Sequence, residues 1–142
     1  MKIKGSNVLI TGGASGIGKI MGRMALEKGA RNLIIWDINI AATEAVKQEF
    51  KELGNVYGYR VDVSSNDTVV NTYKRVLEDC GEVDILINCA GIVTSNKTFD
   101  KMSADEITRT ININTIAPMF VAHAMLPGML RRNRGHICTI TS

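Results

Sequence analysis

A glycine-rich stretch near the start of the chain has the residue types that a phosphate-binding turn needs, since residues 11–18 read TGGASGIG. Gly12 would let the backbone turn sharply, Gly16 would let it approach a pyrophosphate, and Gly18 would let the following helix pack closely. The first turn of that helix would offer free N–H groups and a positive dipole end to the phosphates. The predicted cofactor-binding residues of this stretch are Gly12, Ser15, Gly16, Ile17 and Gly18.

An acid follows the glycine-rich stretch at the distance that a dinucleotide site requires. Asp37 closes the apolar run at 33–36, about 20 residues after the turn. A carboxylate there accepts hydrogen bonds from both ribose hydroxyls of an adenosine and repels a 2′-phosphate, so the predicted cofactor is NAD rather than NADP. An ordinary glycine-rich turn and a helix-capping Asp37 are the alternatives that the sequence leaves open.

The elements that must position these residues alternate along the chain, which predicts an α/β fold with a parallel sheet. Strands are expected at residues 7–11, 33–36, 56–61, 85–87 and 136–141, and helices at 19–28, 40–53, 67–80 and 107–132. The last helix contains Pro118 and Pro127 as candidate bends or breaks. Ser103 and Glu106 have the spacing of a capping box before it.

The glycine spacing, Gly-x-x-x-Gly-x-Gly after Thr11, resembles the classical short-chain dehydrogenase/reductase family. Four later stretches extend the resemblance over the whole chain: Asp62-Val63, Asn88-Cys89-Ala90-Gly91, Asn112-Ile113-Asn114 and residues 136–142. Within that family, residues 35–39 and 135–137 look like the branch of 17β-hydroxysteroid and retinol dehydrogenases. The resemblance implies a Rossmann-type, doubly wound sheet of order 3-2-1-4-5 with helices on both faces and the cofactor across the strands' carboxyl ends.

The resemblance also implies roles for individual cofactor-site residues. Asp62 would meet the adenine ring through its side chain and Val63 through its backbone, although Asp62 would look the same as a turn or cap residue. Asn88 would mainly tie the central sheet together, while the backbone of Ala90 and Gly91 would lie along the nicotinamide ribose. Cys89 replaces the second Asn of the family pattern, and we read it as a harmless substitution rather than a redox centre.

Two catalytic residues follow from the same resemblance. Asn114 matches the family's catalytic Asn, which binds a water of the proton relay, and a core Asn bonded to backbone is the alternative. Ser142 matches the catalytic Ser, whose hydroxyl hydrogen-bonds the substrate oxygen. The family's remaining Tyr-x-x-x-Lys pair is absent from these 142 residues, because Tyr57, Tyr59 and Tyr73 are not followed by Lys four positions later.

We therefore interpret residues 1–142 as the N-terminal part, truncated after strand 5, of a longer single-domain enzyme that moves a hydride between NAD(H) and a secondary alcohol or ketone. The chain alone is expected to be inactive. A non-catalytic dinucleotide-binding or interaction module is the alternative, and a sugar-nucleotide epimerase is disfavoured by the glycine spacing. The branch resemblance points to a steroid- or retinoid-like substrate and to a homo-dimer or homo-tetramer built on the long helix.

Bulk composition limits the partners. The net charge of +3 is too small to argue for nucleic acid, and the three cysteines have no metal-site spacing, so no metal is expected. The cysteines stand in mostly apolar contexts, which favours reduced thiols and a cytoplasmic protein. The longest mostly apolar run, 116–129, is too short to span a bilayer, so we expect no membrane segment.

Overall fold

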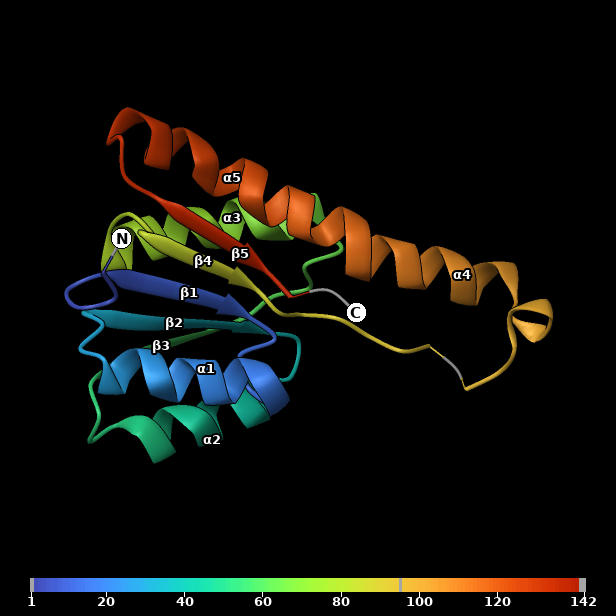
Figure 1. Ribbon diagram of the computed structural model, residues 1–142, viewed down its shortest axis with the longest axis horizontal. Helices are drawn as coiled ribbons and strands as arrows, with labels where there is room; N and C mark the ends of the chain where they lie inside the picture. The colour runs from blue at the N-terminus through green and yellow to red at the C-terminus, as the bar shows by residue number, and fades with distance from the viewer. Residues whose placement is uncertain (1, 95, 141–142) are drawn as a thin grey trace.

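The computed structural model describes residues 2–94 and 96–140, and a parallel sheet of five strands forms its central layer. The strand order β3-β2-β1-β4-β5 confirms the predicted doubly wound topology. Helices cover both faces of the sheet, with α1 and α2 on one side and α3 and α5 on the other (Figure 1). The strands are β1 Asn7–Thr11, β2 Asn32–Asp37, β3 Asn55–Arg60, β4 Ile85–Asn88 and β5 His136–Thr139.

The helices follow the predicted sequence order, with shifted ends. The helix α1 begins three residues before the expected position because the chain enters it directly from the glycine turn. The predicted helix 40–53 ends at Phe50, because its last residues form turns. The helical elements are α1 Gly16–Glu27, α2 Ile40–Phe50, α3 Asn66–Cys80, a 3-10 turn η1 Phe99–Lys101, α4 Ala104–Ile111, a π-helical segment η2 Asn112–Ile116 and α5 Ala117–Arg131.

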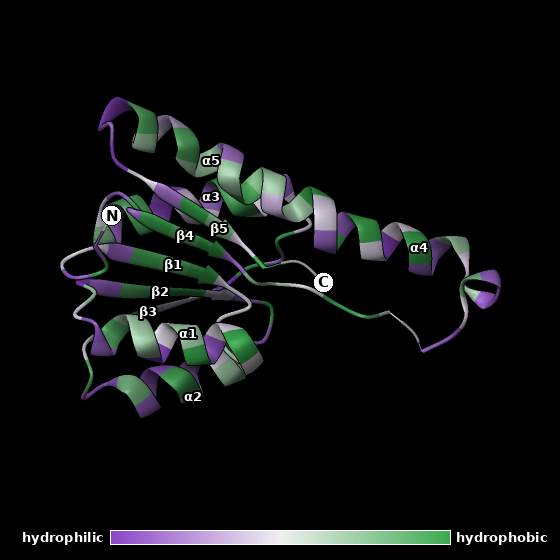
Figure 2. Cartoon of the chain, in the orientation of Figure 1, coloured by the Kyte–Doolittle hydropathy of each residue, from purple (hydrophilic) through white to green (hydrophobic). Residues whose placement is uncertain are grey.

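The central strands are apolar on both faces, as a sheet covered on both sides requires. Leu9, Ile34 and Leu86 belong to the buried cluster on the α3 and α5 side. Their neighbours Val8 and Ile35 belong to the cluster under α1 and α2. Figure 2 shows the result as continuous hydrophobic colour along β1, β2 and β4.

Side-chain caps fix where the helices start. Ser103 and Glu106 form the predicted capping box, with the Ser103 hydroxyl accepting from the Glu106 N–H at 3.2 Å and the Glu106 carboxylate accepting from the Ser103 N–H at 2.8 Å. Ser65 caps α3, and Asn39 caps α2 by accepting from the Ala42 N–H at 3.0 Å. The caps of α2 and α3 set these helix starts at the carboxyl edge of the sheet, where the site lies, whereas α4 begins away from the sheet (Figure 1).

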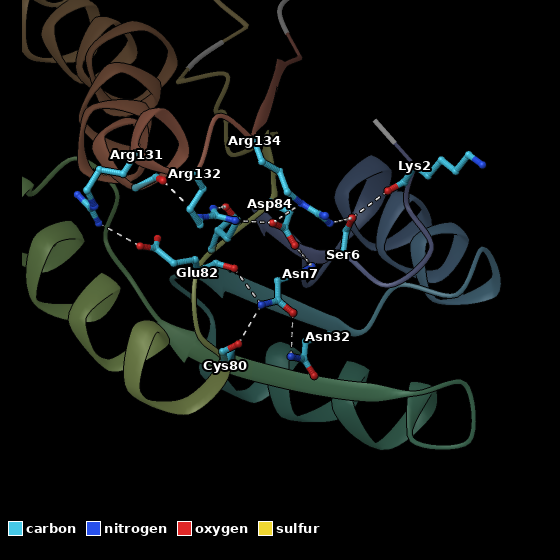
Figure 3. Close-up of polar contacts among 12 residues, drawn as sticks. Lys2, Ser6, Asn7, Asn32, Cys80, Glu82, Asp84, Arg131, Arg132 and Arg134 are labelled. Atoms are coloured by element: carbon cyan, nitrogen blue, oxygen red, sulfur yellow. Dashed lines mark hydrogen bonds and ion pairs between the residues drawn. The ribbon is translucent and has the colours of Figure 1, made fainter.

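A buried carboxylate at the amino edge of the sheet holds the turn between α5 and β5 (Figure 3). Asp84 accepts from the backbone N–H of Asn7 at 3.0 Å, from Arg132 at 2.7 Å and from Arg134 at 3.0 Å. Burial alone would raise the pKa of Asp84, but these three donors together lower it below its ordinary value. The network anchors the residues that lead into β5, so that His136 pairs with Ile85 and Thr139 with Asn88.

The long helix stays helical through both prolines that the sequence marked as candidate breaks. Pro118 falls in the first turn of α5, just after η2, and Pro127 lies inside α5. The resulting helix, Ala104–Arg131, is the one helix among the described residues that is long and apolar enough to cross a membrane, with 28% of its most apolar window buried. The core helix of a soluble protein can pass the same test, so this is weak evidence for a membrane span.

Candidate dinucleotide site

A cavity of about 600 Å³ lies at the carboxyl ends of the strands, between the sheet edge and the part of the long helix that carries Arg109 and Ile113. The stretches that the sequence marked, at 12–18, 37, 62–63 and 90–91, meet in it although they are far apart in the chain. The lining residues are Gly12, Ser15, Gly16, Ile17, Gly18, Trp36, Asp37, Ile38, Val61, Asp62, Val63, Cys89, Ala90, Gly91, Ile92, Arg109, Ile113 and Ile140.

The three glycines of the turn have different physical reasons for lacking a side chain. Gly12 has φ +67°, and an added Cβ would stand 2.9 Å from the Cα of Ala90, so it allows both the turn and close packing on the end of β4. At Gly18 an added Cβ would collide with the carbonyl of Gly12, so the close approach is to the turn itself rather than to the strand. Gly16 has φ +49° with nothing within 4 Å, which leaves open cavity where a pyrophosphate would lie.

The N-terminus of α1 has the features of an anion-binding site. Ser15 is the N-cap residue with extended backbone, but its hydroxyl makes no capping hydrogen bond. The first turn of α1 carries no acidic residue. The helix therefore presents its first N–H groups, its positive dipole end and a spare hydroxyl at the cavity wall.

Asp37 holds the glycine turn as well as lining the cavity. Its carboxylate accepts from the backbone N–H of Ala14 at 3.1 Å and from that of Asn39 at 3.0 Å. The capping alternative is wrong for Asp37, because Asn39 is the N-cap of α2. Each carboxylate oxygen keeps acceptor capacity toward the cavity, since a carboxylate oxygen can accept two hydrogen bonds.

Asp62 and Val63 form the part of the wall that follows β3. One Asp62 oxygen accepts from the Ser64 N–H at 3.0 Å and from the Ser64 hydroxyl at 2.6 Å, so the residue shapes a turn while it lines the cavity. Val63 is buried beside Val61 and Trp36 in the core under this end of the cavity. This corner combines an apolar floor with a carboxylate at its rim, which suits a flat heterocycle with polar edges.

The segment after β4 is fixed by Thr11, a residue to which the sequence analysis assigned no role beyond marking the turn. The Thr11 hydroxyl accepts from the N–H groups of Cys89 and Ala90, both at 3.1 Å. This tie holds the backbone of Ala90 and Gly91 against the cavity. Burial raises the pKa of the Cys89 thiol, which keeps it neutral and agrees with its interpretation as a packing residue.

Asn88 lies apart from the cavity-lining residues. It is 2% exposed, and its amide nitrogen donates to the carbonyl of Pro118 at 3.3 Å. Its amide oxygen is buried with no hydrogen-bond partner in the described parts of the chain. The structure therefore places Asn88 as a tie between β4 and α5, while Ala90 and Gly91 make the wall.

Asn114 sits in the π-helical segment η2, an irregularity that often marks functional positions in helices. Its side chain accepts from the N–H of Ile92 and donates to the carbonyl of Ile92, both at 2.9 Å. This two-point contact agrees with the backbone bonding of the alternative, but Asn114 is exposed and not in the core. Because Pro118 has no N–H, the backbone carbonyl of Asn114 lacks the donor that a regular α-helix supplies at this position. A water of a proton relay could therefore be held by that carbonyl while the side chain positions the loop.

The second predicted catalytic residue, Ser142, lies outside the described residues, as does its neighbour Thr141. Ile140 is the last described residue; it lines the cavity, and its N–H donates to the carbonyl of Asn88 at 2.8 Å. Ile140 thus lies against the end of β4, at the cavity wall.

Several cavity residues escaped the sequence analysis. Arg109 and Ile113 come from the long helix, and Trp36, Ile38, Val61 and Ile92 come from strand ends and adjoining loops. A residue just after a strand end in a parallel sheet is a candidate by position, which would have found Ile38 and Ile92. The helical residues had no comparable signal.

Comparisons with known proteins identify the family to which the chain is similar. Residues 6–142 match the family described as short chain dehydrogenase. The 17-beta-hydroxysteroid dehydrogenase 13 of Mus musculus is 36% identical over 143 residues, covering 99% of this chain and 46% of the relative. The crystal structure of NAD+-bound xylitol dehydrogenase has a TM-score of 0.92 at 27% identity, over 98% of this chain and 54% of that one.

A third comparison is a 7 alpha-hydroxysteroid dehydrogenase complexed with NADH and 7-oxo glycochenodeoxycholic acid. Its TM-score is 0.91 at 30% identity, over 99% of this chain and 55% of that one. The chain thus spans about half the length of the curated relatives and solved structures that it matches.

Proposed function

This chain belongs to the short-chain dehydrogenase family, and on that premise we propose that it forms the dinucleotide-binding part of an NAD(H)-dependent oxidoreductase. The whole enzyme would interconvert a secondary alcohol and a ketone. The observation that carries the proposal is the single cavity where the glycine turn, the N-terminus of α1 and Asp37 meet. A non-catalytic dinucleotide-binding module is the competing proposal.

The residues present fit a nicotinamide dinucleotide. Gly16 leaves open space beside the free N–H groups of α1, as a pyrophosphate needs, and Asp37 offers acceptors to a ribose. The apolar floor of Trp36, Val61 and Val63 suits an adenine. When bound, the cofactor supplies the hydride chemistry of its nicotinamide ring.

The choice of NAD over NADP rests on Asp37. Its carboxylate lies in the cavity and is already held by two backbone N–H groups, so it cannot swing away from a 2′-phosphate without releasing the glycine turn. Repulsion between two anions at close range therefore penalises NADP. The charged ribose contacts in turn favour NAD.

This chain's own residues would position the reacting groups. Thr11 and Asn114 hold the segment from Cys89 to Ile92 at the cavity wall through their hydrogen bonds to its backbone. The carbonyl of Asn114 would hold a relay water, and Ser142 would orient the substrate oxygen. We also propose a steroid- or retinoid-like substrate, supported by the resemblance to hydroxysteroid dehydrogenases.

Assembly and location remain proposals as well. The exposed apolar residues of the long helix, among them Met119, Leu126 and Leu130, support a homo-dimer or homo-tetramer through this helix. The three cysteines are free, which supports a reducing, cytoplasmic compartment.

Binding and turnover are tested separately. Isothermal titration of the purified 142-residue chain should show NAD binding more tightly than NADP, and equal affinity would contradict the role of Asp37. Reading the coding sequence beyond Ser142 for Tyr-x-x-x-Lys tests the catalytic proposal. Turnover of secondary alcohols, followed by NADH absorbance, should appear only in a chain extended through that pair. NAD binding in a full natural chain that lacks the pair and shows no turnover would favour the non-catalytic module.

A further inference from the structure

Arg109 is a cation that lines the dinucleotide cavity, and the proposed function assigns it no role. Arg109, on α4, is the only positively charged residue among those that line the cavity, whereas Asp37 and Asp62 supply two carboxylates. Within the described parts of the chain, the Arg109 guanidinium makes no hydrogen bond or ion pair. Of its two acidic neighbours on α4, Glu106 is occupied by Ser103 and by Lys97, and Asp105 forms no ion pair with Arg109.

The fold places Arg109 near the turn that follows β3. The helices α3 and α5 pack against each other and both begin at the carboxyl edge of the sheet. The turn before α3 contains Asp62 and Val63, and the residues just before α5 include Arg109 and Ile113. Both groups line one cavity at this edge, so a ligand bound there can contact them together.

Arg109 and Ile113 lie one helical turn apart, so they present neighbouring side chains to the cavity. Ile113 adds apolar surface to the cavity that Trp36, Val61 and Val63 also line. Arg109 adds a planar cation whose stem can lie along that surface while its head remains wet. A guanidinium plane of this kind stacks on the face of an aromatic ring.

The other charged groups of a dinucleotide have their partners elsewhere in the cavity. The N-terminus of α1, free of acidic residues in its first turn, meets the phosphates, and Asp37 meets the ribose. Asp62 directs one oxygen at Ser64 and forms no ion pair with Arg109. The guanidinium is therefore available to a neutral base.

We propose that Arg109 is a base-binding residue, with its guanidinium stacked on the outer face of the adenine of a bound dinucleotide. The inference rests on the proposed dinucleotide function and adds a residue that sets the preference for the adenine half. It predicts that the free energy lost on removing Arg109 is the same for adenosine as for NAD.

The test measures dissociation constants by isothermal titration in the full-length protein with adenosine, NAD and nicotinamide mononucleotide. Arg109→Met keeps the length of the stem and removes the planar cation, and Arg109→Lys keeps the charge without the plane. Arg109→Met should lower the affinities for adenosine and for NAD by the same factor, about 3- to 30-fold, and leave the affinity for nicotinamide mononucleotide unchanged. Arg109→Lys should recover only a small part of the loss.

The control is Lys101→Met, which removes an equal charge from the neighbouring 3-10 turn outside the cavity lining and should change nothing. Circular dichroism and melting temperatures establish that each variant is folded. NAD binding that is unchanged in Arg109→Met overturns the inference and leaves the proposed function standing. If Arg109→Met binds NAD more weakly but adenosine equally well, and Arg109→Lys restores NAD binding, then Arg109 contacts a phosphate. That result also overturns the inference. An unmutated protein that binds neither ligand overturns the proposed function and this inference together.

Discussion

Gly16 offers the sharpest test of the phosphate-binding turn, because its backbone strain and its site role can be separated. Its φ of +49° makes alanine unfavourable at this position by about 1–2 kcal/mol. No atom stands within 4 Å of an added Cβ, so Gly16→Ala brings no clash inside the protein. The methyl group would instead enter the cavity that Gly16 lines.

Gly5 supplies a matched control. It has φ +75°, and an added Cβ there also meets nothing within 4 Å, but Gly5 is not among the residues that line the dinucleotide cavity. Gly5→Ala and Gly16→Ala should therefore lower the free energy of unfolding by similar amounts. For a domain of this size, the melting temperature should fall by about 3–8 °C in both.

Binding should separate the two variants. A methyl group at residue 16 keeps a pyrophosphate from the N–H groups of α1, and each charge-assisted hydrogen bond contributes about 1.5–3 kcal/mol. Gly16→Ala should lower the affinity for NAD by about 10- to 100-fold and leave the affinity for adenosine unchanged. Gly5→Ala should bind NAD with the unmutated affinity. Isothermal titration at matched folded fraction is the assay. NAD affinities that are equal in the two variants would refute the phosphate role of Gly16.

Three further predictions concern charged and polar contacts. Asp37→Ser removes a charged acceptor, so it should lower the affinity for NAD about 10- to 100-fold. It should also reduce the preference for NAD over NADP, measured as the ratio of the two dissociation constants. Asn114→Ala removes both hydrogen bonds that fix η2 against Ile92 and so releases the carbonyl proposed to hold the relay water. In the whole enzyme it should lower kcat more than NAD affinity, and a kcat within about twofold of the unmutated value would make the assignment wrong. Asp84→Asn should destabilise the fold at pH 7 by about 1–2 kcal/mol in urea unfolding, because Arg132 and Arg134 lose a charged acceptor but remain partly solvated. Since the folded pKa of Asp84 is lowered, its contribution is complete above the ordinary aspartate pKa of about 4 and is lost as the pH falls through the lower folded value, so the two proteins should converge in acid.

The sequence predicted those parts of the site that depend on local patterns. The five strands, the capping box and the glycine turn follow from apolar runs, cap residues and glycine spacing. Each is present, with the strand ends within two residues of the expected positions. The second role of Asp37, holding the glycine turn, was not predicted, because its hydrogen bond to Ala14 joins residues 23 positions apart in the chain. The contact of Thr11 with Ala90 spans 79 positions, and no local pattern encodes it.

Arg109 escaped prediction for a more specific reason. A helical wheel drawn through 107–132 assumes one period, but η2 carries i to i+5 hydrogen bonds such as Ala117 N–H to Asn112 carbonyl. One residue is thereby inserted into the turn, so that the face of α4 is rotated relative to the face of α5 that packs on the sheet. The apolar pattern of α5 consequently gives the wrong face for residues before the insertion.

The same irregularity explains how the long helix can serve the sheet and the site at once. Pro118 removes the N–H that would continue a regular ladder, and its carbonyl accepts from the buried Asn88 at the end of β4. Four residues earlier, the Asn114 side chain hydrogen-bonds the N–H and the carbonyl of Ile92, just beyond the same strand. The helix is therefore registered against β4 and the segment after it by one contact within the π-helical segment and one just after it. A regular helix could present only one constant stripe, whereas this one packs α5 on the core and still directs Ile113 and Arg109 into the cavity.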